Sequence, residues 1–150
     1  HRLVPGLGGA LTGVWAEELS REAILAAIRA RRCFATNGER VLLDVRVAGG
    51  PMGAEAACDG PVPVDCHVVA PRPIESLTLF RDGREMETSK PAANEVVWEI
   101  EDAPGPGLHS YYLEVRLRPL PRTRMAGRGG NLQVARGDYA WSSPNWVHVR

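Results

Sequence analysis

Apolar and polar residues alternate along most of the chain beyond residue 38. In the first such stretch, Val41, Leu43, Val45 and Val47 occupy every second position. A period of two is typical of a β-strand with one face on a hydrophobic core. The same alternation recurs at residues 64–68, 77–80, 96–100, 111–117, 132–134, 139–141 and 147–149. The pattern therefore predicts a succession of short, half-buried strands.

Glycine and proline separate these alternating stretches. The chain contains 16 glycines and 12 prolines, which suits short strands joined by tight turns better than a helical bundle. The Asp82-Gly83 pair follows one apolar stretch and predicts a hairpin turn. We therefore expect a mainly β fold, an antiparallel immunoglobulin-like β-sandwich of about seven or eight strands.

One amphipathic helix is predicted before the first alternating stretch. Ser20 has a side chain suited to capping a helix N-terminus, and Ile24, Leu25 and Ile28 form an apolar stripe at helical spacing. We expect this stripe to pack on the sandwich or on a second copy of the chain, because an apolar stripe left in water promotes association. An apolar segment at residues 11–16 predicts a buried strand preceding the helix.

Two groups of arginines raise the question of anion binding. Arg29, Arg31 and Arg32 fall in the predicted last helical turn, where cations complement the helix dipole. Solvated side chains are the simpler interpretation of this group, with an anion site as the alternative. The second group lies in residues 118–130, which contain no aromatic residue that would stack on a base. We therefore expect a solvated insertion there rather than a nucleic-acid site.

Length and charge restrict the classes of partner. A chain of 150 residues is sufficient for one hydrophobic core, and its formal net charge of zero gives no general attraction to nucleic acid or to a membrane surface. No apolar run is long enough to span a bilayer, and no signal peptide is evident. Because the sequence starts at His1 without a methionine, we expect it to be cut from a longer protein. The compartment stays open between bacterial cytoplasm and periplasm.

The three cysteines give a weak indication of chemistry. Cys33, Cys58 and Cys66 contain no CxxC spacing, and their odd number argues against a disulfide framework. A bridge between Cys58 and Cys66 remains one alternative. The adjacent Cys66 and His67 suggest a metal ligand pair, but two or three ligands without a second close pair are a poor zinc signature. We expect buried or unreactive thiols.

The four histidines do not form a familiar catalytic pattern. His67, His109 and His148 each lie on the polar side of a predicted strand, which places them at the surface. HExxH, GxSxG and P-loop motifs are all missing from the sequence. We therefore expect no complete catalytic site in this chain. His1 differs, because it precedes a glycine-rich turn and a predicted strand, a setting in which loop ligands of barrel enzymes are found.

Two stretches of the sequence resemble a known superfamily. Residues 1–38, with the segments His-Arg, Pro-Gly, Leu-Thr-Gly-Val-Trp-Ala and Ala-Thr-Asn-Gly, are similar to the end of the catalytic region in one branch of the PHP (polymerase and histidinol phosphatase) superfamily. Residues 140–147, Ala-Trp-Ser-Ser-Pro-Asn-Trp-Val, are similar to the closing strands of the same branch. This branch includes carbaryl-hydrolase-like metallohydrolases and proteins with a large domain of unknown function.

The resemblance implies a division of the chain and of its function. Residues 1–38 would contribute the last strand and helix of a catalytic barrel, and residues 39–150 would form a C-terminal β-sandwich. His1 would match the histidine of an Asp-x-His metal-ligand motif whose aspartate precedes this sequence. The parent protein would use divalent zinc, manganese or iron to hydrolyse a phosphoester or related ester. No tightly bound metal is expected in this chain alone.

Two hypotheses about function follow. In the first, the chain is the non-catalytic C-terminal part of a PHP-like metal-dependent hydrolase and contacts the catalytic barrel of the parent chain, with a homodimer as a further partner. In the second, it is an independent β-sandwich module that binds carbohydrate or protein. The second hypothesis would use Trp15, Trp98, Trp141 and Trp146 as contacts. Exposed tryptophans clustered at one end of the sandwich would favour it, and shielded ones would count against it.

Overall fold

The fold of the chain is mainly β, as predicted. We describe a computed structural model, in which residues 9–119 and 138–150 are placed. These residues contain one helix and eleven strands. The elements are β1 (Leu11–Val14), α1 (Arg21–Arg29), β2 (Cys33–Thr36), β3 (Leu42–Val47), β4 (Glu55–Cys58), β5 (Val62–Val69), β6 (Ile74–Arg81), β7 (Arg84–Ser89), β8 (Glu95–Asp102), β9 (Gly107–Leu117), β10 (Tyr139–Ser142) and β11 (Asn145–Val149).

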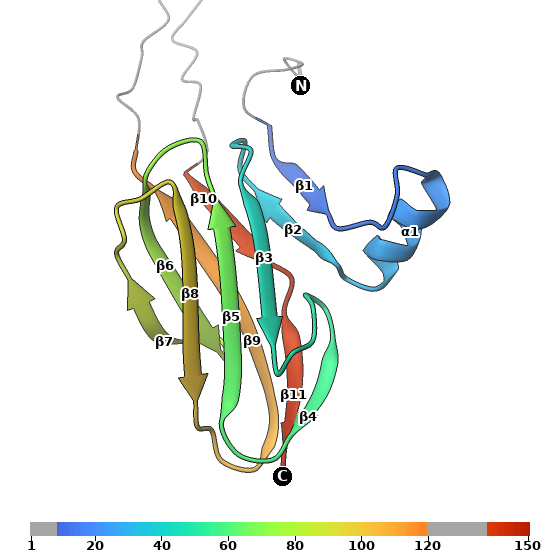
Figure 1. Cartoon of the computed structure of the whole chain (residues 1–150), viewed down its shortest axis with the longest axis vertical. Coiled ribbons are helices and arrows are strands. Elements are labelled where there is room, and N and C mark those ends of the chain that lie inside the picture. Colours follow the sequence, from blue (N-terminus) through green and yellow to red (C-terminus); the bar gives the residue numbers. More distant parts are fainter. Residues whose placement is uncertain (1–8, 120–137) are drawn as a thin grey trace, which may run out of the picture.

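The strands form two sheets that face each other (Figure 1). The smaller sheet has the order β3-β5-β8, with antiparallel pairing throughout. In the larger sheet, the long strand β9 pairs with β6 along one edge and with β10 and β11 along the other. Strand β10 also pairs with β2, and β2 pairs with the edge strand β1. Strand β4 pairs in parallel with β11, and β7 pairs with β6. Three strands facing β6, β9 and β11 give the two-layer arrangement of an immunoglobulin-like sandwich.

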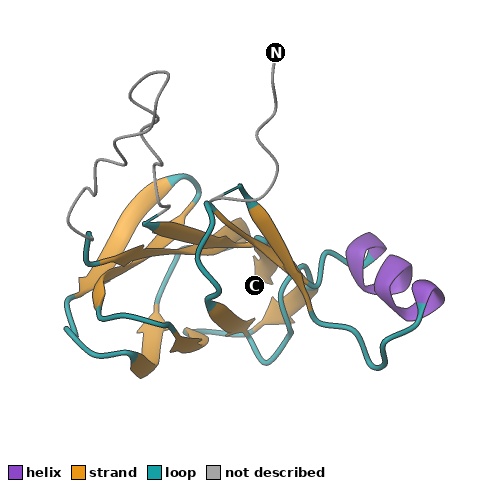
Figure 2. Ribbon diagram, turned by 90° about the horizontal axis from the view of Figure 1, so that it is seen from above, coloured by secondary structure: helices purple, strands orange, loops and turns teal. Residues whose placement is uncertain are grey.

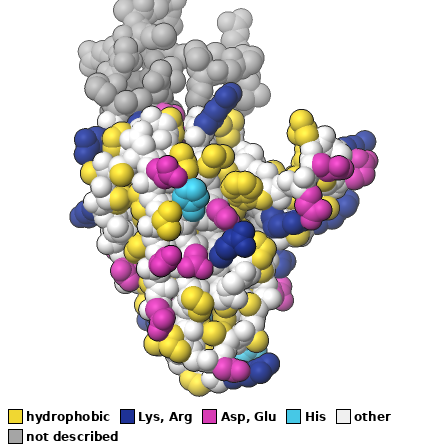
Figure 3. Space-filling view, viewed as in Figure 1, with side chains coloured by type: hydrophobic (Ala, Val, Ile, Leu, Met, Phe, Trp, Pro, Cys, Tyr) yellow, Lys and Arg dark blue, Asp and Glu magenta, His cyan; other side chains and the backbone are white. Residues whose placement is uncertain are grey.

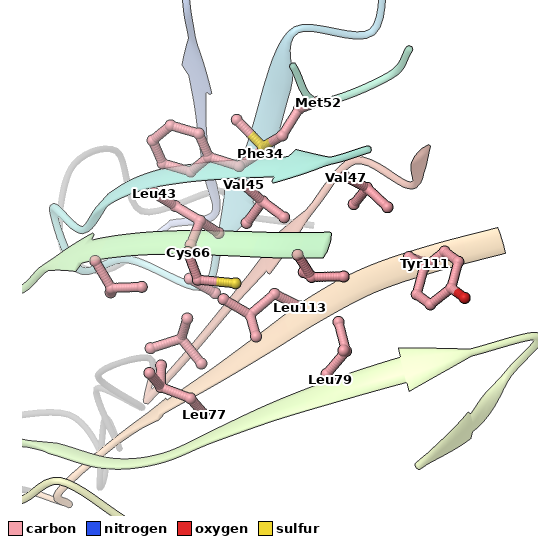
Figure 4. Packing of buried hydrophobic residues seen from close by; sticks show 14 of the residues in the cluster. Phe34, Leu43, Val45, Val47, Met52, Cys66, Leu77, Leu79, Tyr111 and Leu113 are labelled. Atoms are coloured by element: carbon pink, nitrogen blue, oxygen red, sulfur yellow. The ribbon is translucent and has the colours of Figure 1, made fainter. Parts of the chain in front are cut away.

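The core lies between the two sheets and is formed by the alternating residues (Figure 4). Leu43 and Val45 of β3 have no exposed surface, and Leu77 and Leu113 of the opposing sheet are equally buried. Because successive strand residues point to opposite faces, the intervening residues are left toward solvent. The sequence period therefore places one hydrophobic layer between the sheets, and its burial drives their association.

The number of strands exceeds the predicted seven or eight. In the described ranges, the strands that the sequence did not predict are β2 and β4, and each has a sequence without a clear apolar alternation. Strand β4 is Glu-Ala-Ala-Cys, whose residues have low β propensity, so its pairing with β11 depends on tertiary contacts. The strand predicted at residues 132–134 lies outside the described residues.

The hairpin predicted at Asp82-Gly83 is confirmed. Strands β6 and β7 pair on either side of this dipeptide, and Asp82 and Gly83 have φ angles of 51° and 74°. Two consecutive positive φ values define a type I′ turn, for which an aspartate-glycine pair is favoured.

A half-buried polar network links the two sheets at the end of β8. The Arg81 guanidinium of β6 donates to both carboxylate oxygens of Asp102 in β8, at 2.9 and 2.7 Å, and the Tyr111 hydroxyl of β9 donates to the same carboxylate at 2.8 Å. Burial, and then the bond to Asp102, raise the pKa of Tyr111 above its ordinary value. The carboxylate therefore accepts hydrogen bonds from both neighbouring strands of the opposite sheet.

The N-terminal elements leave the sandwich at one side (Figures 1 and 2). The strand predicted within residues 11–16 is present as β1, but it lies at the edge of the larger sheet and Leu11 is 43% exposed, so the expected burial is wrong. The edge position explains the exposure, because β1 pairs only with β2 in the described part of the chain. Helix α1 connects these two strands. It is too short to cross a membrane, and no other helix is found in the described ranges.

Arg72 contacts residues of both described ranges of the chain. Its guanidinium contacts the carbonyl oxygen of Arg118 and donates to the Asp138 carboxylate at 2.8 Å, and Glu39 lies 3.5 Å from the same guanidinium. A buried arginine thus neutralises two acidic side chains and brings the ends of β9 and β10 together. Most of the arginine-rich stretch predicted at residues 118–130 lies outside the described residues.

Candidate docking surface on the projecting arm

We call residues 9–32, which contain β1 and α1, the arm. Helix α1 begins after Ser20, whose hydroxyl oxygen accepts a hydrogen bond from the Ala23 backbone N–H at 3.1 Å. This bond satisfies one of the four backbone donors that a helix leaves free at its N-terminus, and it confirms the predicted cap. The acidic Glu22 in the first turn complements the positive end of the helix dipole.

The apolar residues of the arm are left largely uncovered. Ala27 is the one buried side chain of α1, whereas Leu25 and Ile28 are 38% and 45% exposed. Ile24 is half-buried, and Leu19 before the helix is 97% exposed. Figure 2 shows why the sandwich does not cover this stripe: α1 stands away from both sheets. Among the described residues, the sandwich leaves Leu25 and Ile28 exposed, and the alternative that the stripe packs on a second copy of the chain stays a prediction.

The end of α1 is fixed to the sandwich by Arg31. The helix stops at Arg29 with Ala30 as its C-cap, and Arg31 has a φ angle of 59°. The Arg31 guanidinium donates twice to the carbonyl oxygen of Gly53, at 3.0 and 2.9 Å, and bonds Glu55 at 3.1 Å. It also lies 4.8 Å from the ring centroid of Trp146 in β11. Arg31 thus contacts the sandwich, although its side chain is 46% exposed. It lies beyond the helix and not in the last turn, where Arg29 lies as predicted.

Gly53 is required where the arm meets the sandwich. A Cβ atom at this position would lie 2.4 Å from the Arg31 Cβ and 2.5 Å from the Ala30 carbonyl oxygen. Its φ angle of 81° also lies in the region that favours glycine. We call Arg31, Gly53, Glu55 and Trp146 the joint. The joint sets the arm at a defined position relative to the sheets.

A cleft of about 380 Å³ separates the arm from the sandwich. The Trp15 indole N–H donates to the Leu43 carbonyl oxygen at 2.8 Å, which ties the arm to the first sandwich strand, and 42% of Trp15 remains exposed. The cleft is lined by Trp15, Ala16, Glu17, Arg32, Asp44, Arg46, Pro51 and Met52. Its charges are balanced, with Arg32 lying 3.7 Å from Glu17 and Arg46 3.5 Å from Asp44. In Figure 3 the arm stands apart from the body of the molecule across this hollow.

The histidines are placed separately, as their spacing suggests. His67 and His148 are exposed, and His67 lies 2.9 Å from Glu95. His1, the predicted metal ligand, lies outside the described residues. Across residues 9–119 and 138–150, no three His, Cys, Asp or Glu side chains converge in a way that would hold a metal ion.

His109 is held more tightly than a surface histidine. Its Nδ1 lies 2.8 Å from Asp82 Oδ2, and its Nε2 lies 2.8 Å from the Gly105 carbonyl oxygen. Both partners accept hydrogen bonds when Asp82 is ionised, so the geometry fits a doubly protonated imidazolium. The bond to Asp82 raises the pKa of His109. Burial alone would raise the pKa of Asp82, but the hydrogen bonds from His109 and Ser110 lower it below its ordinary value.

The cysteines are free thiols and are dispersed. Cys66 is in the core, where burial raises its pKa to about 12. The Cys58 thiol donates to the Pro61 carbonyl oxygen at 3.2 Å, and Cys33 lies 3.4 Å from the Ser143 hydroxyl. The proposed bridge between Cys58 and Cys66 is not formed. Because the thiolate is the reactive form, the raised pKa of Cys66 makes it unreactive at neutral pH.

The four tryptophans do not form one surface. Trp15 is exposed on the arm, and Trp98 packs against the core from β8. The Trp141 indole N–H donates to Glu114 at 2.9 Å and its ring stacks on Tyr139, and Trp146 lies under Arg31. The ring faces of Trp141 and Trp146 are thus partly occupied by neighbours within the chain.

The sequence identifies the helix of this surface but misses the joint. Ser20 and the apolar stripe follow from local spacing. Arg31 meets Gly53 across 22 positions of sequence, so no local period indicates the contact. The one available signal is the run Gly49-Gly50-Pro51-Met52-Gly53, since clustered glycines mark places where the backbone turns or approaches another segment.

Comparison with known proteins finds a family model whose match includes the arm. Residues 4–74 match the model of DUF3604, a protein family of unknown function. An uncharacterized protein of Chlamydia pneumoniae is 27% identical over 93% of this chain and 23% of its own length. An uncharacterized protein of Chlamydia trachomatis is 28% identical over 93% of this chain and 22% of its own length. The chain thus spans less than a quarter of these relatives, and no solved structure matches it. The sequence similar to DUF3604 runs from the arm through the first sandwich strands.

Proposed function

We propose that this chain is the non-catalytic C-terminal part of a PHP-like metal-dependent hydrolase, and that its arm docks on the catalytic barrel of the parent protein. The observation that carries the proposal is the exposed apolar stripe of α1. The helix is capped and amphipathic, but Leu25 and Ile28 cover nothing in the sandwich. A helix with this pattern is stabilised by packing of its apolar face rather than by propensity alone.

The joint supports docking over flexible attachment. Arg31 makes four contacts with the sandwich, and the Gly53 backbone approaches the helix end without space for a side chain. An arm held in one position presents a preformed surface, which reduces the entropy lost on binding. The chain covers only 22% to 23% of the length of these relatives. In a protein of that length, the remaining polypeptide would be available to contact the arm.

The divalent metal that the resemblance implies is assigned to the parent protein. The described residues do not fit a metal centre, since no three of their His, Cys, Asp or Glu side chains come together. We therefore derive no catalytic step in this chain. His1 is proposed as a metal ligand only together with residues of the parent that lie outside this sequence.

Hydrogen exchange on two polypeptides tests the proposal. We expect the amides of α1 to exchange more slowly in the product of the complete reading frame than in the 150-residue chain, whereas the exchange of β5 in the core should not change. The complete product with Mn²⁺ should hydrolyse an aryl phosphate, and the 150-residue chain should not. Equal exchange of α1 in both polypeptides would contradict docking. Activity of the short chain alone would contradict its non-catalytic role.

The second hypothesis, an independent binding module for carbohydrate or protein, has less support. Such a module would present open aromatic faces at one end of the sandwich. Trp15 is exposed on the arm, while Trp98, Trp141 and Trp146 are half-buried at separate places. Binding of a soluble polysaccharide that quenches the Trp15 fluorescence would favour this alternative.

A further inference from the structure

The smaller sheet has an open edge on the side away from the arm. Strand β8 is its outermost strand and pairs only with β5 in the described ranges. In Figure 1, β8 and β7 lie on the opposite side of the molecule from α1. A surface at this edge is therefore independent of the docking surface proposed above.

The larger sheet extends one strand beyond the smaller sheet at this edge. Asp102 at the end of β8 bonds Arg81 of β6 and Tyr111 of β9, which places β8 opposite those two strands. Strand β7 is the next strand outward from β6, and its residues Arg84 to Thr88 are all exposed. A hollow of about 330 Å³ lined by Arg81, Asp82, Arg84 and Met86 lies at the hairpin end. Constant-type immunoglobulin domains have four strands in one sheet, whereas here the smaller sheet has three strands within the described ranges and β7 pairs with β6 in the other sheet.

Of the features that protect an exposed edge, β8 has charged side chains but no bulge and no break in register. It pairs with β5 in unbroken register over all eight residues, and it contains no proline and no lysine. By contrast, β7 has an irregular register with β6 and only polar or flexible side chains, while β1 and β4 have four residues each. Val96, Trp98 and Ile100 pack on the core from β8 but remain partly exposed. One more strand would cover them.

The charges of β8 decide which strand can pair there. Its sequence Glu-Val-Val-Trp-Glu-Ile-Glu-Asp carries four acidic residues and no basic one. A second copy in the antiparallel pairing centred on Trp98 would set Glu95 against Glu101, and like charges directly opposite are destabilising. In Figure 3 acidic side chains gather over the smaller sheet, and Asp65 lies beside Glu99 in the register of β5 and β8.

We propose that the open edge of β8 binds an extended basic segment of another polypeptide by strand addition, with its backbone paired to β8 and its arginine or lysine side chains next to Glu99 and Glu101. Backbone hydrogen bonds would provide affinity and alternate side chains would provide selectivity, as in other cases of β-augmentation. The added strand would lie over β7 and extend the smaller sheet.

Three synthetic ten-residue peptides test this inference on the 150-residue chain. The first alternates arginine with valine, the second has glutamate in place of arginine, and the third is the arginine peptide with N-methyl groups on alternate backbone nitrogens. We expect the first peptide to bind in calorimetry at 0.15 M salt, on the order of physiological ionic strength, and to slow hydrogen exchange of β8. The glutamate peptide and the N-methylated peptide should not bind.

A charge-reversed variant supplies the matched test on the protein. Glu99 and Glu101 are exposed, so Glu99→Arg with Glu101→Arg should leave the fold intact, which circular dichroism would verify. We expect this variant to lose about tenfold or more in affinity for the arginine peptide and to gain affinity for the glutamate peptide. Glu18→Arg with Glu22→Arg on the arm, with the same change in net charge, should bind as the unmodified chain does. Equal binding of the N-methylated peptide, or slowed exchange outside β8 instead of in β8, would overturn the inference.

Discussion

Replacing Gly53 by alanine should weaken the attachment of the arm. The added Cβ would lie 2.4 Å from the Arg31 Cβ and 2.5 Å from the Ala30 carbonyl oxygen, both far inside van der Waals contact. Because the second atom belongs to the backbone, the helix end must move away. The movement would separate the Arg31 guanidinium from the Gly53 carbonyl oxygen, which accepts two of its hydrogen bonds.

Gly49→Ala is the matched control for this change. Gly49 lies in the same connection and has a φ angle of 76°, close to the 81° of Gly53, but nothing lies within 4 Å of its Cβ position. Both substitutions share the cost of a side chain at positive φ, about 1–2 kcal/mol. Both also share the loss of chain freedom in the unfolded state. The difference between the two variants therefore isolates the close approach to the helix end.

The difference should amount to about 1.5–2 kcal/mol, because a hydrogen bond to a charged group contributes about 1.5–3 kcal/mol. The partial exposure of Arg31 places its paired bonds toward the lower end of that range. Urea unfolding followed by circular dichroism would measure the free energy of unfolding. Hydrogen exchange would show whether α1 opens separately from the sandwich. Equal unfolding free energies for both variants, with unchanged exchange in α1, would refute the role of the joint.

Three further changes test the remaining contacts. Tyr111→Phe removes the hydroxyl that donates to Asp102 and should lower the free energy of unfolding by about 1–2 kcal/mol in urea titrations. His109→Gln should change the pH dependence of stability. The raised pKa of His109 gives stability that is complete below 6.5 and is lost as pH rises through the folded value, and the lowered pKa of Asp82 gives stability that is lost as pH falls through its folded value. In the variant, the free energy of unfolding should no longer fall as pH rises through the folded pKa of His109. The difference should be at most about 1 kcal/mol, because Asp82 is 45% exposed. Ser20→Ala should cost about 1 kcal/mol and reduce the helical signal in circular dichroism.

The sandwich was predictable because its determinants are local. A period of two identifies Val45 and Leu113 as residues that face the core. The Asp82-Gly83 pair predicts its turn because both residues readily adopt positive φ angles. Strands β2 and β4, which have neither such a period nor a turn signal that pairs them with a neighbour, were missed. Strand β4 consists of weak strand formers and exists because β11 offers an edge for parallel pairing, which is a property of the folded molecule.

The joint was not predictable because its parts are distant in sequence. Arg31 fits equally well in a solvated last turn, and only the position of Gly53 against the helix end makes it a structural contact. The same limitation applies to β8. Its apolar alternation predicts a strand but not whether that strand lies at an edge.

The two proposed binding surfaces follow from one physical criterion. In most of the sandwich, the apolar pattern of the sequence and the burial in the structure agree, as expected for a fold whose local and tertiary preferences support each other. They disagree at α1, where Leu25 and Ile28 remain exposed, and at β8, where Trp98 is only partly covered. These apolar side chains lie outside the core, so a rearrangement of the core side chains would not cover them. An apolar pattern that the chain itself leaves uncovered is best satisfied by a second polypeptide segment, and the balanced charges near α1 and the acidic residues of β8 indicate that the two segments differ.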